Sequence, residues 1–321
     1  MPGTDMSLEQ LKIYQGSYPA PVDFEFHWEE VKRKLEAYTF KPEEEVVRFA
    51  GSKLRYSRIT ITAPDGTLLR AKYIRPQEGE QPRKYPLVVQ FHDYPQASRS
   101  WFHLSRYAAV GYAVLAPDCR GQGGCSEAGE PGKGATGFGP MFFGLQDRVE
   151  KLYLHKIIED ALLWILAGKL LTETEKEKIV VYGEGQGAGL ALSTAALFSE
   201  IGLCGAHYPM LCDYYRVWEK DFDINAYEGL RYYFRWKDPL HEREKEVFDK
   251  LAYVDVKNFA PMIRGKVLMS TGLQDVVSPP SAQFAVFNGL QCEKRHLVYP
   301  KHGHELINFF ENEWLNCLIP G

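Results

Sequence analysis

The sequence has few cysteines and does not group them. The six cysteines in this chain of 321 residues are Cys119, Cys125, Cys204, Cys212, Cys292 and Cys317, and no two of them form a CxxC pair. This spacing argues against a zinc knuckle and against a dense disulfide framework. We therefore expect no metal site, and we expect buried thiols in a reducing compartment.

Long apolar runs and long runs of one charge are also missing. The longest apolar stretch, Ala161 to Ala167, is too short to span a bilayer. Residues Met1 to Gln15 lack the charged start and apolar segment of a signal peptide. The formal net charge is only −4, and nothing in its distribution favours nucleic acid or an anionic membrane. We expect a cytoplasmic protein with no nucleic-acid partner and no membrane partner.

The chain shows no internal repeat and no low-complexity segment. Its 45% of hydrophobic residues suffices for one large core. We divide it into a helical lead-in over residues 1–50 that packs on the main domain, and a main domain over residues 51–321. Residues 211–254 are rich in tyrosine, tryptophan and charge, and they interrupt the pattern of the main domain. They are either an insertion that shapes a ligand site or a helical cover without a binding role.

The main domain begins with a predicted hairpin. Tyr56–Ile61 and Leu69–Ile74 are β-rich runs on either side of the turn tripeptide Pro64-Asp65-Gly66. Further apolar runs then alternate with helical patterns, as strands buried on both faces do. These runs are Pro86–Phe91, Tyr112–Ala116, Lys178–Tyr182, Gly205–Tyr208, Lys266–Ser270 and His296–Tyr299. The sequence therefore predicts an α/β fold with a doubly wound, mostly parallel sheet and an antiparallel N-terminal edge.

A glycine-rich turn follows the predicted strand Lys178–Tyr182. It reads Gly183-Glu184-Gly185-Gln186-Gly187-Ala188-Gly189 and leads into the helical run Leu190–Phe198. An α/β-hydrolase places its nucleophile in such a strand–turn–helix, in the pattern G-x-S-x-G. The middle residue here is Gly185, which has no side chain and cannot form an acyl-enzyme.

Other interpretations of this turn are weaker. Centring the motif on Glu184 puts Tyr182 and Gln186 at the two positions that need small residues. A dinucleotide-binding loop would accept Ala188 at its last position, but no acidic residue ends a second strand about twenty residues later. Taken alone, the segment is equally a plain glycine-rich turn.

Two later segments favour the hydrolase interpretation. Asp275 follows the predicted strand Lys266–Ser270, and His304 follows the last predicted strand. The order turn, Asp, His is that of an α/β-hydrolase triad, in which the acid orients the imidazole that moves the proton. Taken singly, Asp275 is as easily a helix cap and His304 a loop histidine. The second donor of an oxyanion hole would come from the loop Phe91–Tyr94, beside the backbone N–H of Gln186.

Several motifs together resemble the acetyl xylan esterase and cephalosporin C deacetylase family, from about Asp23 to the C-terminus. The matching segments are Arg120-Gly121-Gln122-Gly123 within 118–124, Gly185-Gln186-Gly187, Asp275 with Pro279-Pro280-Ser281, and Gly303-His304-Glu305.

The resemblance implies hydrolysis of acetyl esters on small acetylated sugars or related compounds, without a cofactor. By position, Gly185 replaces the nucleophile, Asp275 is the acid and His304 is the base. The resemblance assigns the oxyanion N–H groups to Tyr94 and Gln186. It also implies a homo-oligomer, a hexamer in particular.

The chain departs from the family pattern at three positions. Gly185 removes the nucleophile, Asp93 stands where the family usually has glycine, and Glu184 adds a carboxylate beside the turn. A carboxylate near the oxyanion hole would oppose developing negative charge. We therefore expect an inactive or very weak member that still binds a ligand. The alternatives are an enzyme in which His304 and Asp275 activate water directly, and a laboratory substitution at Gly185.

Overall fold

The computed structural model describes residues 5–49, 53–77, 83–130, 132–133, 139–223 and 225–319. In this part of the chain, nine strands form one sheet. The strands are β1 (Glu43–Val46), β2 (Leu54–Thr62), β3 (Leu68–Pro76), β4 (Tyr85–Phe91), β5 (Ala113–Pro117), β6 (Thr174–Glu184), β7 (Leu203–His207), β8 (Lys266–Gly272) and β9 (Lys294–Tyr299).

The strand order is β1-β2-β3-β5-β4-β6-β7-β8-β9. Strands β2 and β3 form the predicted antiparallel hairpin, and β3 runs antiparallel to β5. From β5 to β9, every neighbouring pair is parallel. The predicted mostly parallel sheet with an antiparallel N-terminal edge is confirmed.

Eleven α-helices lie around the sheet in the described residues. They are α1 (Leu8–Leu11), α2 (Phe24–Ala37), α3 (Trp101–Ala109), α4 (Tyr153–Leu170), α5 (Gln186–Leu197), α6 (Tyr214–Glu219), α7 (Glu228–Trp236), α8 (Glu244–Leu251), α9 (Val256–Phe259), α10 (Pro280–Gly289) and α11 (Asn308–Leu318). None of these helices combines the length and the apolar character that a membrane span needs.

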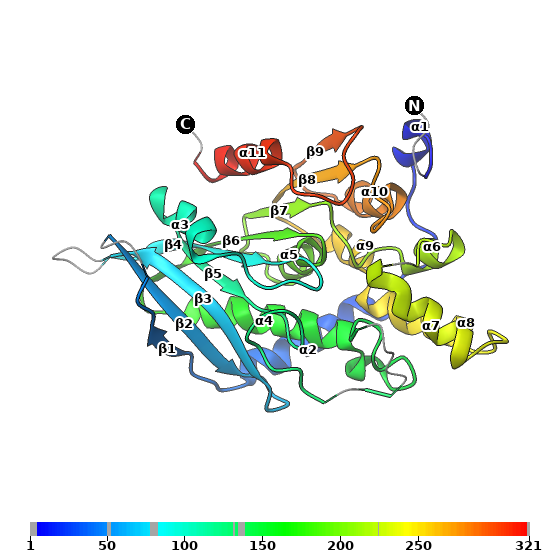
Figure 1. Ribbon diagram of the computed structural model, residues 1–321, viewed down its shortest axis with the longest axis horizontal. Helices are drawn as coiled ribbons and strands as arrows, with labels where there is room; N and C mark the ends of the chain where they lie inside the picture. The colour runs from blue at the N-terminus through cyan, green and yellow to red at the C-terminus, as the bar shows by residue number, and fades with distance from the viewer. Residues whose placement is uncertain are drawn as a thin grey trace.

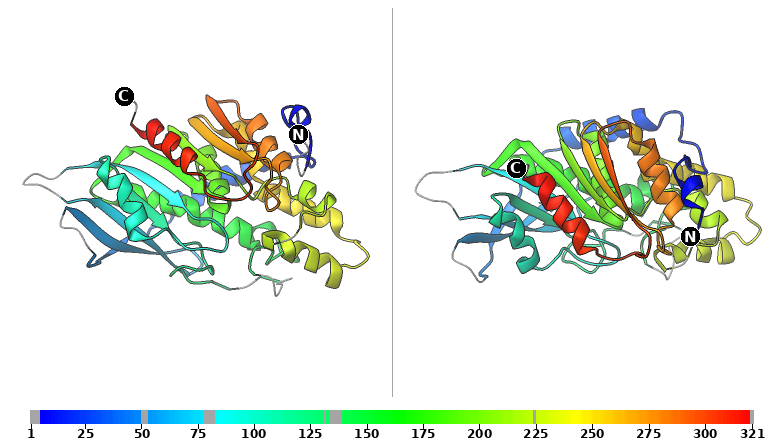
Figure 2. Two further views of the ribbon diagram at one scale, coloured as in Figure 1. Left: turned by 45° about the horizontal axis from the view of Figure 1, so that its top comes forward. Right: turned by 90° about the horizontal axis from the view of Figure 1, so that it is seen from above.

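The helices cover both faces of the sheet, and the strand residues divide between them. Leu87 and Val89 of β4 pack in the core with α4 and α5, whereas Val88 packs with Tyr107 of α3 and Trp314 of α11. Successive side chains of a strand point to opposite faces, so a strand covered on both sides must be apolar throughout. Figure 1 shows α3 and α11 on one side of the central strands, and α2 and α4 on the other. Figure 2 shows the same layers from two further directions.

Strand β1 and helix α3 are among the elements that were not predicted from the sequence, as is the short helix α9. Strand β1 is a four-residue exposed edge strand of sequence EEEV that pairs antiparallel with β2, and it has no apolar alternation to reveal it. Helix α3 begins after Ser100, whose hydroxyl accepts a hydrogen bond from the backbone N–H of His103. Between β7 and β8, the aromatic segment forms α6, α7 and α8, which lie together at one end of the molecule (Figure 1).

Candidate active site

The turn between β6 and α5 has the backbone of a nucleophile elbow. Gly185 has φ +53° and ψ −117°, a conformation that favours glycine. Its carbonyl oxygen accepts hydrogen bonds from the backbone N–H groups of Ala188, Gly189 and Met210 at 3.1, 3.2 and 2.9 Å. A Cβ on Gly187 would lie 2.3 Å from the carbonyl oxygen of Phe91, so the helix start and β4 are in close contact. At Gly187, the neighbouring backbone therefore leaves no room for a side chain.

Asp275 and His304 meet as the sequence predicts. His304 Nδ1 lies 2.9 Å from Asp275 Oδ2. The backbone N–H groups of Val277 and Ser278 each donate to Asp275 Oδ1 at 2.8 Å, and Gln283 Nε2 donates to Oδ2 at 2.9 Å. The carboxylate is fully buried, so these donors and the imidazole replace its water. The arrangement fixes the ring of His304 with Nε2 directed toward the elbow.

The two predicted oxyanion donors also come together, but they bind a side chain of the protein itself. The backbone N–H groups of Tyr94 and Gln186 donate to Asp93 Oδ1 at 2.7 and 3.0 Å. The other oxygen, Asp93 Oδ2, lies 3.1 Å from His304 Nε2. The Asp93 carboxylate therefore binds both predicted oxyanion donors and the predicted base.

The same carboxylate occupies the space that a side chain at residue 185 would need. A Cβ built on Gly185 would lie 1.8 Å from Asp93 Oδ1, 2.3 Å from Cγ and 2.8 Å from Oδ2. These distances are far below van der Waals contact. Asp93 was recognised in the sequence as a departure from the family pattern, but its occupation of the nucleophile position was not predicted.

His304 is held protonated by this arrangement. Burial alone would lower its pKa, but hydrogen bonds to Asp275 and Asp93, and the charges of both carboxylates, outweigh burial and raise the pKa to about 10. The ring of Tyr208 packs against the imidazole with centroids 4.6 Å apart. At neutral pH the site is thus an imidazolium between two carboxylates.

Glu184 does not add unbalanced charge to this side of the elbow. Its buried carboxylate forms an ion pair with Arg99, whose Nε lies 3.1 Å from Oε2. Burial raises the pKa of Glu184, and the charge of Arg99 opposes that rise. The sequence-based concern about Glu184 is therefore wrong, because the sequence does not show the arginine partner.

Glu184 also belongs to a group with His103 and Glu311 whose ligand atoms lie within 4.8 Å of one another. Both carboxylates already have an arginine: Arg99 pairs with Glu184, and Arg106 Nη1 lies 2.6 Å from Glu311. Two fixed guanidinium groups would repel a cation, so we interpret this group as a salt-bridge network.

The motif at residues 118–124 supports the elbow from one side. Arg120 forms a bidentate pair with Asp160 at 2.6 Å for both contacts, and it also reaches Asp65 at 2.7 Å. Gln122 Nε2 lies 2.9 Å from the side-chain oxygen of Gln186. These contacts fix the loop against the start of α5.

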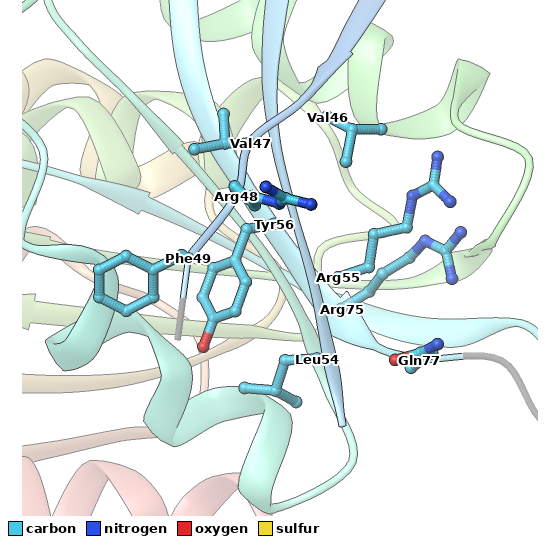
Figure 3. A pocket seen from close by; sticks show the side chains of 9 residues that line it. All are labelled: Val46, Val47, Arg48, Phe49, Leu54, Arg55, Tyr56, Arg75 and Gln77. Atoms are coloured by element: carbon cyan, nitrogen blue, oxygen red, sulfur yellow. The ribbon is translucent and has the colours of Figure 1, made fainter. Parts of the chain in front are cut away.

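A cavity of about 760 Å³ opens onto the site. Asp93, Tyr94, Gln122 and His304 line it, and Ala226 of the segment between β7 and β8 lies in its wall. A second hollow of about 770 Å³ lies against β1 and β2 (Figure 3). Its described lining includes arginines and apolar side chains but no histidine, serine or carboxylate, so we place the candidate active site at the first cavity.

The fold and the elbow, with Asp275 and His304 at the ends of later strands, define an α/β-hydrolase. The chain matches the acetyl xylan esterase (AXE1) family over residues 1–319, and it belongs to that family. Its fold is similar to acetyl xylan esterase 1 from Thermoanaerobacterium sp. JW/SL YS485, with a TM-score of 0.92 and 37% identity over 97% of this chain and 98% of that chain. It is similar to an acetyl xylan esterase from Paenibacillus sp. R4, with a TM-score of 0.91 and 29% identity over 98% of this chain and 99% of the other.

A curated relative is the acetyl esterase Axe7A of Xylanibacter ruminicola, 28% identical over 175 residues. The match covers 54% of this chain and 38% of that protein, so the chain spans well under half the length of this relative.

Proposed function

We propose that this member of the acetyl xylan esterase family binds a small acetylated sugar or a related ester without hydrolysing it through an acyl-enzyme. The family and its solved relatives supply the ligand class, because those relatives are named acetyl xylan esterases. The proposed lack of acyl-enzyme chemistry rests on Gly185, because glycine has no side chain that could act as a nucleophile.

One observation carries the proposal: the Asp93 carboxylate lies where the serine and the substrate carbonyl oxygen would both be. Acyl transfer needs a nucleophilic side chain and two free N–H donors for the oxyanion. Here the side chain is absent and both donors are bound to a negative charge. An ester in the cavity therefore meets neither a nucleophilic side chain nor a free pair of N–H donors.

Direct activation of water by His304 and Asp275 is disfavoured by the same geometry. A general base needs a free lone pair, and His304 Nε2 faces Asp93 Oδ2 at 3.1 Å as a donor. The raised pKa of His304, about 10, keeps that proton in place at neutral pH. We therefore favour binding over ester hydrolysis by an altered mechanism.

The resemblance to the family also leads us to propose a homo-oligomer, a hexamer in particular. Exposed apolar side chains such as Phe26, Trp236, Leu240 and Phe309 are available for contacts between subunits. Light scattering coupled to size-exclusion chromatography measures the mass directly; a monomer at micromolar concentration contradicts this part of the proposal.

The test of the proposed function is an assay of ester turnover beside an assay of binding. We expect no hydrolysis of p-nitrophenyl acetate or acetylated xylo-oligosaccharides above the buffer rate, and saturable calorimetric binding of the same oligosaccharides. Ester turnover that His304→Ala abolishes and Glu305→Gln preserves would overturn the proposal. Glu305 is a matched control because its carboxylate is exposed and bonded to His302 and Gly303.

A further inference from the structure

The Asp93 carboxylate is held in an arrangement suited to a nucleophile. Oδ1 is fixed by the backbone N–H groups of Tyr94 and Gln186, while Oδ2 is next to Nε2 of His304. Asp93 and His304 both line the cavity of about 760 Å³. A carboxylate fixed at one oxygen, with the other beside an acid at a cavity wall, can form a covalent ester with a ligand.

We propose that Asp93 attacks a saturated carbon of a small epoxide and that His304 protonates the opening ring. This activity goes beyond the proposed function because it concerns an alkyl carbon and needs neither a serine nor a free oxyanion hole. Its failure would leave the proposed loss of ester hydrolysis untouched.

The first step consumes the charge pair of the site. Asp93 Oδ2 forms a bond to the epoxide carbon, the ring C–O bond breaks, and the ring oxygen takes the proton from His304 Nε2. The products are a hydroxyalkyl ester of Asp93 and a neutral imidazole. The alkylated carboxyl no longer carries a charge, which removes one of the two carboxylates that raise the pKa of His304.

The second step uses water and restores the site. Neutral His304, oriented by Asp275, takes a proton from water as the water oxygen attacks Asp93 Cγ. Negative charge develops on Oδ1, where Tyr94 and Gln186 already donate. The Cγ–O bond to the alkyl group breaks and the departing alkoxide takes one proton. The two steps together convert one epoxide and one water into a diol, and they leave Asp93 ionised and His304 protonated again.

The charges of Asp93 and His304 favour an epoxide over an ester as the substrate. An epoxide oxygen must be protonated as it leaves, and the imidazolium beside Asp93 is the acid for that purpose. An ester is a poor substrate because its carbonyl oxygen would need the N–H groups that Asp93 Oδ1 occupies. Small epoxides also fit a cavity of this volume, whose described lining mixes Tyr94, Gln122 and Val277.

The experiment uses the full chain with styrene oxide and glycidol as probes. We expect diol formation above the buffer rate, with the diol measured by chromatography. With the protein in excess and H₂¹⁸O as solvent, the first diol formed should carry unlabelled oxygen from Asp93. The peptide containing Asp93 should in turn gain ¹⁸O, measured by mass spectrometry. This label requires no variant and therefore does not depend on the folding of one.

Variants then separate chemistry from structure. Asp93→Asn keeps an oxygen acceptor for Tyr94 and Gln186 but removes the nucleophile, so diol formation should fall to the buffer rate. Glu305→Gln should retain the parental rate within about twofold. No diol and no labelled Asp93 with either probe would overturn the proposal. So would ¹⁸O in the first diol with Asp93 unlabelled, because that outcome means direct attack by water.

Discussion

The Oδ1 atom of Asp93 lies 1.8 Å from the position that a Cβ on Gly185 would take. Two residues that are distant in the sequence therefore exclude one another: a side chain at residue 185 and the observed carboxylate at residue 93 cannot share this space. The turn has the conformation of a nucleophile elbow, and the carboxylate of a neighbouring loop occupies the space beside Gly185.

Gly185→Ser alone should destabilise the protein by about 1–3 kcal/mol, the cost of a side chain in a strained backbone conformation. It must also displace Asp93 from three hydrogen bonds. Urea unfolding measures the loss. Gly66→Ser is the matched control, since Gly66 has φ +86° but nothing within 4 Å of an added Cβ. We expect the control to lose less stability; a Gly185→Ser protein more stable than the parent would show that the turn is not an elbow.

The double variant Gly185→Ser/Asp93→Gly should hydrolyse p-nitrophenyl acetate. The serine supplies a hydroxyl. Removal of the Asp93 carboxylate leaves the backbone N–H groups of Tyr94 and Gln186 free to bind an oxyanion, and it frees Nε2 of His304. Restoring an oxyanion donor accounts for roughly 10²–10³-fold in rate. Gly185→Ser alone should stay near the buffer rate because the carboxylate competes for the hole. Adding His304→Ala should abolish the gained activity, and equal rates for the single and double variants would contradict the assigned position of Asp93.

Stability should fall as the pH rises from about 6.5 toward 10. The folded-state pKa of His304, about 10, lies above its unfolded value of about 6.5. The folded protein therefore binds the extra proton in this window. The stabilisation is complete below the lower value and is lost as the pH passes through the upper one. Urea unfolding from pH 6 to 10 should show a decline on the order of a few kcal/mol.

Asp93→Asn should weaken this pH dependence, because one of the two carboxylates that face His304 disappears. His302→Gln, at an exposed histidine of the same loop, serves as the control and should keep the parental profile. An unchanged slope in Asp93→Asn would mean that Asp93 does not pair with His304 in solution.

Arg99→Ala should destabilise the protein by about 3 kcal/mol, because it leaves the Glu184 carboxylate buried without its partner. Arg33→Ala removes the partner of Glu30 on the exposed face of α2 and should change stability little. Thermal and urea unfolding of both variants would check the difference. A similar effect for the two would show that Glu184 is hydrated rather than buried.

The sequence predicted the sheet well because its central strands are covered on both faces. Such strands must be apolar, and runs such as Pro86–Phe91 carry that signal without ambiguity. Strand β1 was not predicted because an exposed edge strand need not be apolar, and its residues are glutamates and one valine. Helix α3 was not predicted because its apolar face can be recognised only when its contacts with β3 and β5 are known.

The candidate site was predictable only as far as backbone positions determine it. Strand ends and turns bring together Asp275, His304, Tyr94 and Gln186. The strand ends can be located in the sequence from the order of the apolar runs along the chain. The behaviour of Asp93 depends on a side-chain direction across the elbow, which no local pattern encodes. Arg99 and Glu184 are 85 positions apart, so their pairing was equally invisible in the sequence.

The glycine at position 185 also has a consequence for how this chain can change over generations. Asp93→Gly on its own frees the N–H groups of Tyr94 and Gln186 but supplies no hydroxyl, and Gly185→Ser on its own supplies a hydroxyl that competes with the Asp93 carboxylate for space. We expect esterase activity from neither change alone, so any route to that activity through this site requires both substitutions. The side chains at residues 93 and 185 share one space, and the choice of residue at either position restricts the choice at the other.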